Sequence, residues 1–213
     1  MLLNILLNGS ENFVFNLVVF LLVALALVVS ISIHEFAHAY IADKLGDPTA
    51  RYMGRVTLNP KAHLDPMGTV LLLLAGFGWG KPVPFNPIHL KNPKRDAALI
   101  SFAGPASNFI LATLLAIVLK LLPNVPFFFL AESFLFLTIF YNLVLGIFNL
   151  IPVHPLDGFK IVNGLLPNEL SIQWMQMAPY GIFILLLLIF TRTTSLIIDP
   201  LLSFSLKILG VDY

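Results

Sequence analysis

The sequence contains no cysteine and few charged residues, and both shortages limit what the chain can be. Without cysteine, neither a disulfide framework nor a thiolate metal site can form. Charged residues make up 11% of the 213 residues and hydrophobic residues 58%, whereas about 25% of a typical soluble domain is charged. The formal net charge of +1 indicates no nucleic-acid partner and no acidic partner. The composition is typical of a membrane protein.

Uncharged windows of the sequence predict membrane spans. A helix needs ~20 largely apolar residues to cross the hydrocarbon core, and four windows reach that length: 12–33, 97–119, 133–153 and 170–191. A fifth window, 66–80, is shorter and ends among glycines, which favours a re-entrant or partly inserted segment. The tail 195–209 is interrupted by Asp199 and Pro200, so it is either interfacial or a further segment.

Two segments outside these windows carry a different pattern. Residues 50–59 and 81–87 combine β-branched and aromatic residues with flanking Gly, Pro and Asn, which predicts short strands beside the membrane. The predicted fold is therefore an all-α polytopic membrane protein with about four to six transmembrane or re-entrant segments and short membrane-associated β-strands. We expect residues 1–213 to form a single membrane-embedded domain.

The distribution of positive charge predicts the orientation of the chain. Eight of the twelve Lys and Arg residues lie between positions 44 and 95. Loops rich in Lys and Arg normally stay cytoplasmic, so segments 43–65 and 81–96 should share the cytoplasmic side. Window 66–80 should then enter and leave the membrane on that side, with the N-terminus and loop 120–132 outside. This topology brings the ends of windows 12–33 and 133–153 to the same face.

The stretch ISIHEFAHAY, residues 31–40, places three ionisable side chains at the end of the first window. On a helix, His34 and His38 lie one turn apart on one face and can bind one metal ion. Glu35, between them, would act as general base for a bound water. Ionisable residues at membrane depth are costly and mark functional sites by default. The pattern therefore favours a metal site over a chance match.

A catalytic zinc usually has three protein ligands and one open position, so a third ligand is needed. In the absence of cysteine, the candidates are Asp157, His154, His63 and His89. Asp157 follows a window that ends on the predicted side, although a lone Asp-Gly pair more often marks a turn. Its agreement in depth with the HExxH motif favours Asp157, and the three histidines remain alternatives.

Three motifs together resemble the site-2 protease family, intramembrane zinc metalloproteases of the M50 type. The stretch HEFAH matches the HExxH motif of this family, NLIPVHPLDG resembles its NxxPxxPxDG element, and AGPASN matches its GPxxN element. The resemblance covers residues 30–165. It implies that one zinc ion per chain is bound by His34, His38 and Asp157, and that Glu35 activates water.

The resemblance also implies a role for Asn108, the last residue of AGPASN. In the family this residue lies near the zinc and helps to hold the substrate or the oxyanion. The alternative for Asn108 is a packing role, because amides often hydrogen-bond between membrane helices. Gly104 and Pro105 of the same motif are expected to allow close helix packing or a kink.

The stretches GDPTARYMGRVTLNPKAHLDPMG and FGWGKPVPFNP are similar to the short bacterial branch of the family, which lacks PDZ and CBS domains. The resemblance implies hydrolysis of peptide bonds within or near transmembrane segments of membrane-protein substrates. The enzyme would be a multi-pass protein of the cell membrane with its active site toward the cytoplasm and no nucleic-acid partner. A non-proteolytic zinc-binding scaffold is the main alternative, but structural zinc sites use four protein ligands. Neither the substrate nor the oligomeric state can be predicted.

Overall fold

The computed structural model describes residues 13–75, 79–123 and 129–211. The first apolar window lies in α2 (Phe13–Lys44), a helix of 32 residues. At 1.5 Å per residue this helix is ~48 Å long, whereas the hydrocarbon core is ~30 Å thick. The predicted span ended at residue 33, but the helix continues through the HExxH motif to Lys44. His34 and His38 therefore project from a continuous helix.

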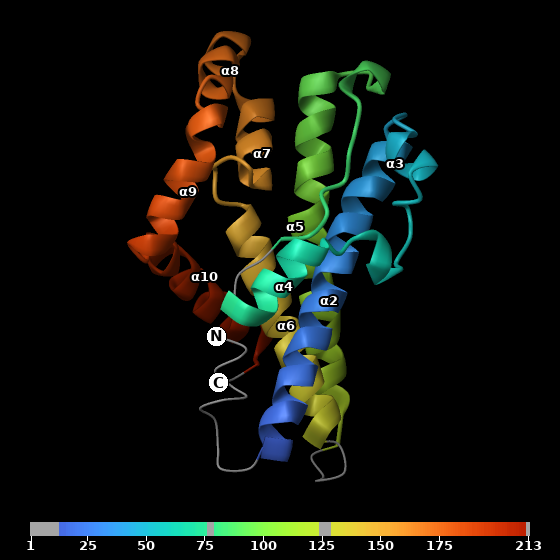
Figure 1. Ribbon diagram of the computed structural model, residues 1–213, viewed down its shortest axis with the longest axis vertical. Helices are drawn as coiled ribbons and strands as arrows, with labels where there is room; N and C mark the ends of the chain where they lie inside the picture. The colour runs from blue at the N-terminus through green and yellow to red at the C-terminus, as the bar shows by residue number, and fades with distance from the viewer. Residues whose placement is uncertain (1–12, 76–78, 124–128, 212–213) are drawn as a thin grey trace.

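The other two long helices are α5 (Pro93–Leu121) and α6 (Phe129–Asn149). Figure 1 shows α2, α5 and α6 side by side, and each of the three contacts the other two. By length and composition, α2, α5, α6 and the segment Asn168–Phe190 can each cross a membrane. This confirms the four predicted windows.

The fourth of these segments is not one continuous helix. It consists of α8 (Asn168–Met175), the 3-10 turn η4 (Ala178–Tyr180) and α9 (Gly181–Phe190). The chain then turns at Arg192, which has a φ of 58°, and continues as α10 (Thr193–Leu209). α10 packs against α6, and together with α5 these helices form the largest apolar core: Ala112, Ala116, Ile139, Leu143, Ile147, Leu202, Leu206 and Val211.

The first part of the fifth window forms a short helix, α4 (Pro66–Ala75), and residues 76–78 of the window lie outside the described ranges. Ten residues span ~15 Å, which is too short to cross a membrane. The flanks of this segment lie together, because Leu64 and Gly80 form an isolated antiparallel bridge and the Lys81 N–H donates to the His63 carbonyl at 2.7 Å. This pairing agrees with the prediction that window 66–80 returns to the side from which it enters.

The predicted short strands were wrong. Segment 50–59 begins inside α3 (Thr49–Tyr52), and segment 81–87 has no regular structure until η2 (Pro87–His89). Within the described ranges, the bridge of Leu64 with Gly80 is the only β-pairing. Prolines at 82 and 84 lack the N–H that a strand ladder needs. The carbonyls of Lys81 and Pro82 instead accept hydrogen bonds from the Arg55 side chain.

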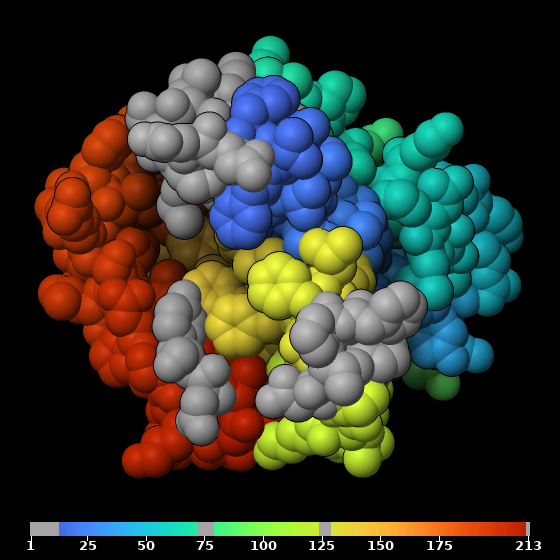
Figure 2. Space-filling model, turned by 90° about the horizontal axis from the view of Figure 1, so that it is seen from below, coloured from blue at the N-terminus to red at the C-terminus, as the bar shows by residue number. Residues whose placement is uncertain are grey.

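Two remaining elements lie at the end of the molecule that carries the basic loops. η1 (Pro60–Ala62) precedes α4, and α7 (Asp157–Leu165) packs against α5. Figure 2 views the opposite end, where the first turns of α2, the start of α6 and the end of α5 lie together, with α9 and α10 along one side. Large apolar side chains such as Phe15, Leu121 and Phe129 are exposed there. Such an apolar exterior is compatible with a protein that lies in a bilayer.

Candidate metal centre

Two histidines on α2 face one another across one helical turn. The rings of His34 and His38 are perpendicular, with centroids 4.6 Å apart, and both side chains are buried. Their Nε2 atoms are 3.0 Å apart. This is the arrangement that the i, i+4 spacing of the HExxH motif predicts.

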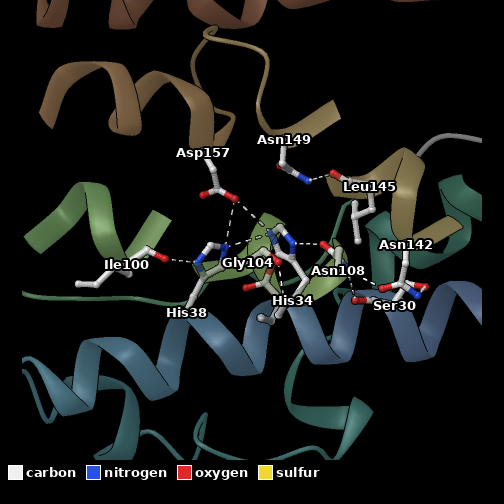
Figure 3. Close-up of polar contacts among 12 residues, drawn as sticks. Ser30, His34, His38, Ile100, Gly104, Asn108, Asn142, Leu145, Asn149 and Asp157 are labelled. Atoms are coloured by element: carbon white, nitrogen blue, oxygen red, sulfur yellow. Dashed lines mark hydrogen bonds and ion pairs between the residues drawn. The ribbon is translucent and has the colours of Figure 1, made fainter. Parts of the chain in front are cut away.

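Asp157, the first residue of α7, reaches the same point from another helix (Figure 3). Its Oδ2 lies 3.2 Å from the Nε2 of His34 and 3.2 Å from the Nε2 of His38. Burial raises the pKa of Asp157, but its contacts with His38 and His34 outweigh this, so this pKa lies well below its usual range. The carboxylate is therefore ionised, which is the form that binds cations.

The outer nitrogens of both rings are hydrogen-bonded to α5. His34 Nδ1 lies 2.6 Å from Asn108 Oδ1, and His38 Nδ1 lies 2.6 Å from the carbonyl oxygen of Ile100. Both partners are acceptors, so each Nδ1 carries the proton and each Nε2 presents a lone pair. Two lone pairs and one carboxylate oxygen thus converge within 4.8 Å. A nitrogen and oxygen donor set without thiolate fits the ligands that zinc takes in catalytic sites.

The histidine rings pack directly on the backbone of α5 at Gly104. A Cβ at this position would lie 2.5 Å from Cε1 and Nε2 of His38 and 2.6 Å from Cε1 of His34. Real Cβ contacts are longer than 3.0 Å, so only glycine allows this approach. The close packing predicted for Gly104 is thus found, and its partners are the two imidazole rings.

A cavity of about 130 Å³ lies beside the three converging side chains. The Glu35 carboxylate also faces this cavity, and its buried Oε2 has no hydrogen-bond partner. The same oxygen lies 4.0 Å from Nη2 of the buried Arg55. The walls combine polar residues with apolar side chains from segment 81–87. The lining is His34, Glu35, His38, Pro82, Val83, Phe85, Ile100, Ser101, Asn149, Pro155, Asp157 and Lys160.

The three alternative ligands make other contacts. The His63 Nε2 lies 2.6 Å from the carbonyl oxygen of Thr57, and the His89 Nδ1 lies 2.9 Å from Oδ1 of Asp47. The His154 ring packs edge-on against Phe159, with centroids 5.5 Å apart. Of the four candidates for the third position, only Asp157 lies with His34 and His38.

Hydrogen bonds from Asn86 and His89 to the Asp47 carboxylate attach segment 81–90 to the loop that follows α2. Asp47 Oδ2 accepts from the Asn86 N–H at 2.5 Å, and its Oδ1 accepts from Thr49. Burial raises the pKa of Asp47, but its hydrogen bonds with Thr49, His89 and Asn86 outweigh this and lower it. An ionised Asp47 therefore holds the wall of the cavity in position.

Two residues of this region escaped the sequence analysis. Arg55 joins the wall segment to Glu35, and Asn142, from the middle of α6, hydrogen-bonds to Asn108 at 2.8 Å. The only signal for Asn142 is an amide within an apolar window, which costs free energy in a membrane unless it is bonded. Arg55 had no distinguishing signal, because it is one of several basic residues in a loop.

Comparison with known proteins identifies the family. The model of peptidase family M50 matches residues 22–129 and 125–190. "Putative zinc metalloprotease YwhC" of Bacillus subtilis (strain 168) is 43% identical over 185 residues, which cover 84% of each chain. Rip2 of Mycobacterium tuberculosis (strain H37Rv), which carries the same description, is 31% identical over 82% of this chain and 69% of its own length.

A more distant relative is archaeal. The zinc metalloprotease MJ0392 of Methanocaldococcus jannaschii is 30% identical over 76% of this chain and 38% of its own length. No solved structure matches the chain. The family match covers the motif residues at positions 34–38, 103–108 and 149–158. The chain belongs to peptidase family M50 and is a zinc metalloprotease.

Proposed function

We propose that the protein is an intramembrane endopeptidase in which His34, His38 and Asp157 hold one zinc ion. The observation that carries this proposal is the convergence of their three donor atoms within 4.8 Å. α2, which carries both histidines, is long and apolar enough to cross a membrane. A zinc ion held there would supply Lewis acidity, both toward water and toward the carbonyl of the scissile peptide bond.

Glu35 is the proposed general base. Its carboxylate faces the same cavity as the three ligands, and its Oε2 has no hydrogen-bond partner and is free to accept a proton. Glu35 would take a proton from the attacking water and deliver it to the leaving amine nitrogen. The guanidinium of Arg55 lies 4.0 Å from this carboxylate and also hydrogen-bonds to the carbonyls of the cavity wall.

The α5 contacts would hold the ligands in position during the reaction. Asn108 and the carbonyl of Ile100 each fix one imidazole through its Nδ1, as the hydrogen-bond partners of metal-bound histidines usually do. Both groups of the Asn108 amide are engaged in hydrogen bonds to His34, Asn142 and Ser30. We therefore propose that Asn108 acts by positioning His34 rather than by contacting the oxyanion.

The proposed substrates are transmembrane segments of other membrane proteins. Peptide bonds inside a helix are shielded by their own hydrogen bonds, so the substrate helix must unwind locally at the site. Segment 81–86 has no regular structure, and its residues Pro82, Val83 and Phe85 line one wall of the cavity. We propose that the unwound substrate lies along this wall. Its apolar surface suits residues that come from a membrane span.

The basic loops support a cytoplasmic active site. Segments 43–65 and 81–96 carry most of the positive charge. Pro82 and Phe85 of the second segment line the cavity, and Arg55 of the first hydrogen-bonds to the Pro82 carbonyl. By the positive-inside rule both segments lie on the cytoplasmic side. We therefore propose cleavage near the cytoplasmic boundary of the membrane.

A zinc-binding scaffold without proteolysis is less well supported. Structural zinc sites use four protein ligands, and among the described residues a group of three His and acidic side chains converges here. The unbonded Glu35 oxygen beside this group would have no purpose in a structural site.

The proposed metal site can be tested by substitution of Asp157. Asp157→Ala removes one of three ligands, so zinc content after purification in the presence of a competing chelator should fall sharply, and cleavage of a reconstituted helical membrane substrate should be lost. Glu169→Ala, which removes an exposed carboxylate on α8, is the control and should retain both. Full zinc occupancy in Asp157→Ala would show that another residue, such as His63 or His154, completes the site.

A further inference from the structure

A chain of buried polar side chains connects α6 to the metal-site histidine His34. Asn142 of α6, Ser30 of α2 and Asn108 of α5 are each 0% exposed. Figure 3 shows them in sequence behind His34, on the side away from Asp157. Groups buried this deeply are almost always hydrogen-bonded, and these three are bonded to one another and to nearby carbonyls.

The orientation of the Asn142 amide is fixed by its neighbours. Its Nδ2 donates to the Thr138 carbonyl at 2.7 Å and to the Ser30 hydroxyl at 2.8 Å. The single hydroxyl proton of Ser30 is used in a bond to the Ala26 carbonyl at 2.7 Å. A reversed amide would therefore bring the Asn142 oxygen against two acceptors, which leaves one allowed orientation.

This orientation determines that of Asn108 in turn. The Asn142 Oδ1 accepts from the Asn108 Nδ2 at 2.8 Å, and the same Nδ2 also donates to the Ser30 carbonyl at 3.3 Å. The Asn108 Oδ1 must then face His34, where it accepts from Nδ1 at 2.6 Å. His34 thus carries its proton on Nδ1, and its Nε2 keeps the lone pair that a metal needs.

We propose that Asn142 is a positioning residue that selects the metal-binding tautomer of His34 by holding the amide of Asn108. This inference rests on the zinc site proposed above. Without the Asn142 oxygen, only the longer bond to the Ser30 carbonyl, at 3.3 Å, opposes a half rotation of the Asn108 amide, which would offer a donor to His34 Nδ1. That contact favours the tautomer with the proton on Nε2, which competes with metal binding. α6 would in this way control the affinity of a site whose ligands lie on α2 and α7.

The test compares two buried substitutions on α6 in the full-length, detergent-solubilised protein. Asn142→Leu removes the oxygen that holds Asn108. Thr138→Val removes a buried hydroxyl one turn away, whose bond to the Phe134 carbonyl is not part of the chain, and leaves the Thr138 carbonyl in place. Zinc affinity is measured by competition with a chromophoric chelator. Loss of partners outside the ligand shell typically weakens metal binding 10–100-fold, so we expect Asn142→Leu to weaken it by roughly tenfold and Thr138→Val to leave it unchanged.

Two comparisons distinguish a failure of the proposed zinc site from a failure of the proposed role of Asn142. His34→Ala should abolish zinc binding; if it does not, the proposed zinc site is wrong and this inference falls with it. If His34→Ala abolishes binding but Asn142→Leu matches the unsubstituted protein, the zinc site stands and the role of Asn142 is refuted. An equal loss in Thr138→Val would mean that packing, not the amide, is responsible, and would also refute it.

Nitrogen NMR of the zinc-free protein labelled at histidine reads the tautomer directly. The His34 Nδ1 should be protonated in the unsubstituted protein, and the proton should shift toward Nε2 in Asn142→Leu. If Asn142→Leu does not fold, Asn142→Ser replaces it in both measurements with the same expectation. A serine at this position would bond to the carbonyl four residues earlier and would not reach Asn108. An unchanged His34 signal in the folded variant would overturn the proposal.

Discussion

Replacing Gly104 by alanine is expected to disable the metal site without touching a ligand. The added methyl group would lie 2.5 Å from Nε2 and Cε1 of His38 and 2.6 Å from Cε1 of His34. Both rings are also held by hydrogen bonds to α5 one turn before and one turn after Gly104, so they cannot simply turn away. Either the rings or the helix must move by about 1 Å, a displacement that can cost 10²-fold in rate.

The free-energy balance of Gly104→Ala can be worked out from the same contacts. Alanine favours a helix over glycine by ~1 kcal/mol, but overpacking a tight contact typically costs ~1–3 kcal/mol. We therefore expect a small net loss of stability. Zinc affinity should fall by roughly tenfold or more, because displacing a ligand weakens metal binding more than removing a group that hydrogen-bonds to a ligand. The fall in kcat/KM for a reconstituted membrane substrate should approach ~100-fold.

Gly146→Ala is the matched control for this prediction, because Gly146 is a buried glycine in a neighbouring helix. Its added methyl group would meet ring carbons of Phe109 at 3.2 Å, a contact that a small ring movement relieves. Zinc content, cleavage rate and thermal unfolding are measured for both variants. The reasoning is refuted if Gly104→Ala binds zinc and cleaves like the unsubstituted protein, or if Gly146→Ala loses zinc to the same extent.

Two further predictions follow from the basic loops. Arg55→Gln should lower kcat/KM by at least about tenfold, because each lost charge-assisted hydrogen bond to the wall segment contributes ~1.5–3 kcal/mol. Arg51→Gln, which removes an exposed guanidinium paired with Asp43, is the control and should have little effect. Equal rates for the two variants would contradict the role of Arg55. In intact cells, an impermeant thiol reagent should label a single cysteine at Pro123 but not one at Thr57; labelling at position 57 would reverse the proposed orientation.

The spans and the convergence of His34 with His38 were predictable because their signals are local. Hydropathy over some twenty residues is sufficient to find α2, α5 and α6, and the spacing of His34 and His38 fixes them on one helical face. Asp157 is different. It is separated from the histidines by more than a hundred residues, and the residues themselves left three histidines as alternatives until the resemblance to a family was considered.

The parts that could not be predicted depend on contacts between distant segments. Segment 81–87 has the composition of a strand, but its prolines lack the N–H groups that strand pairing needs. The carbonyls of Lys81 and Pro82 accept hydrogen bonds from the Arg55 side chain instead of from a partner strand. Asn142 looks like an isolated amide in an apolar window, and its role depends on Asn108 and Ser30 on two other helices. Nor could the spacing of the motif show that Gly104 supports both histidine rings. Pairings of this kind have no periodicity that a single sequence reveals.

Substitution of Glu35 by glutamine tests the central claim most directly. Glutamine keeps the shape of the side chain and removes its basicity, and Glu35 is not one of the three converging ligands. The protein should therefore keep its fold and its zinc, while hydrolysis of a helical membrane substrate should fall by at least ~100-fold, because positioned acid–base groups contribute typically 10²–10⁴-fold. Zinc content and cleavage rate are measured on the same reconstituted sample. A Glu35→Gln protein that binds zinc and still cleaves at the original rate would contradict hydrolysis at this site.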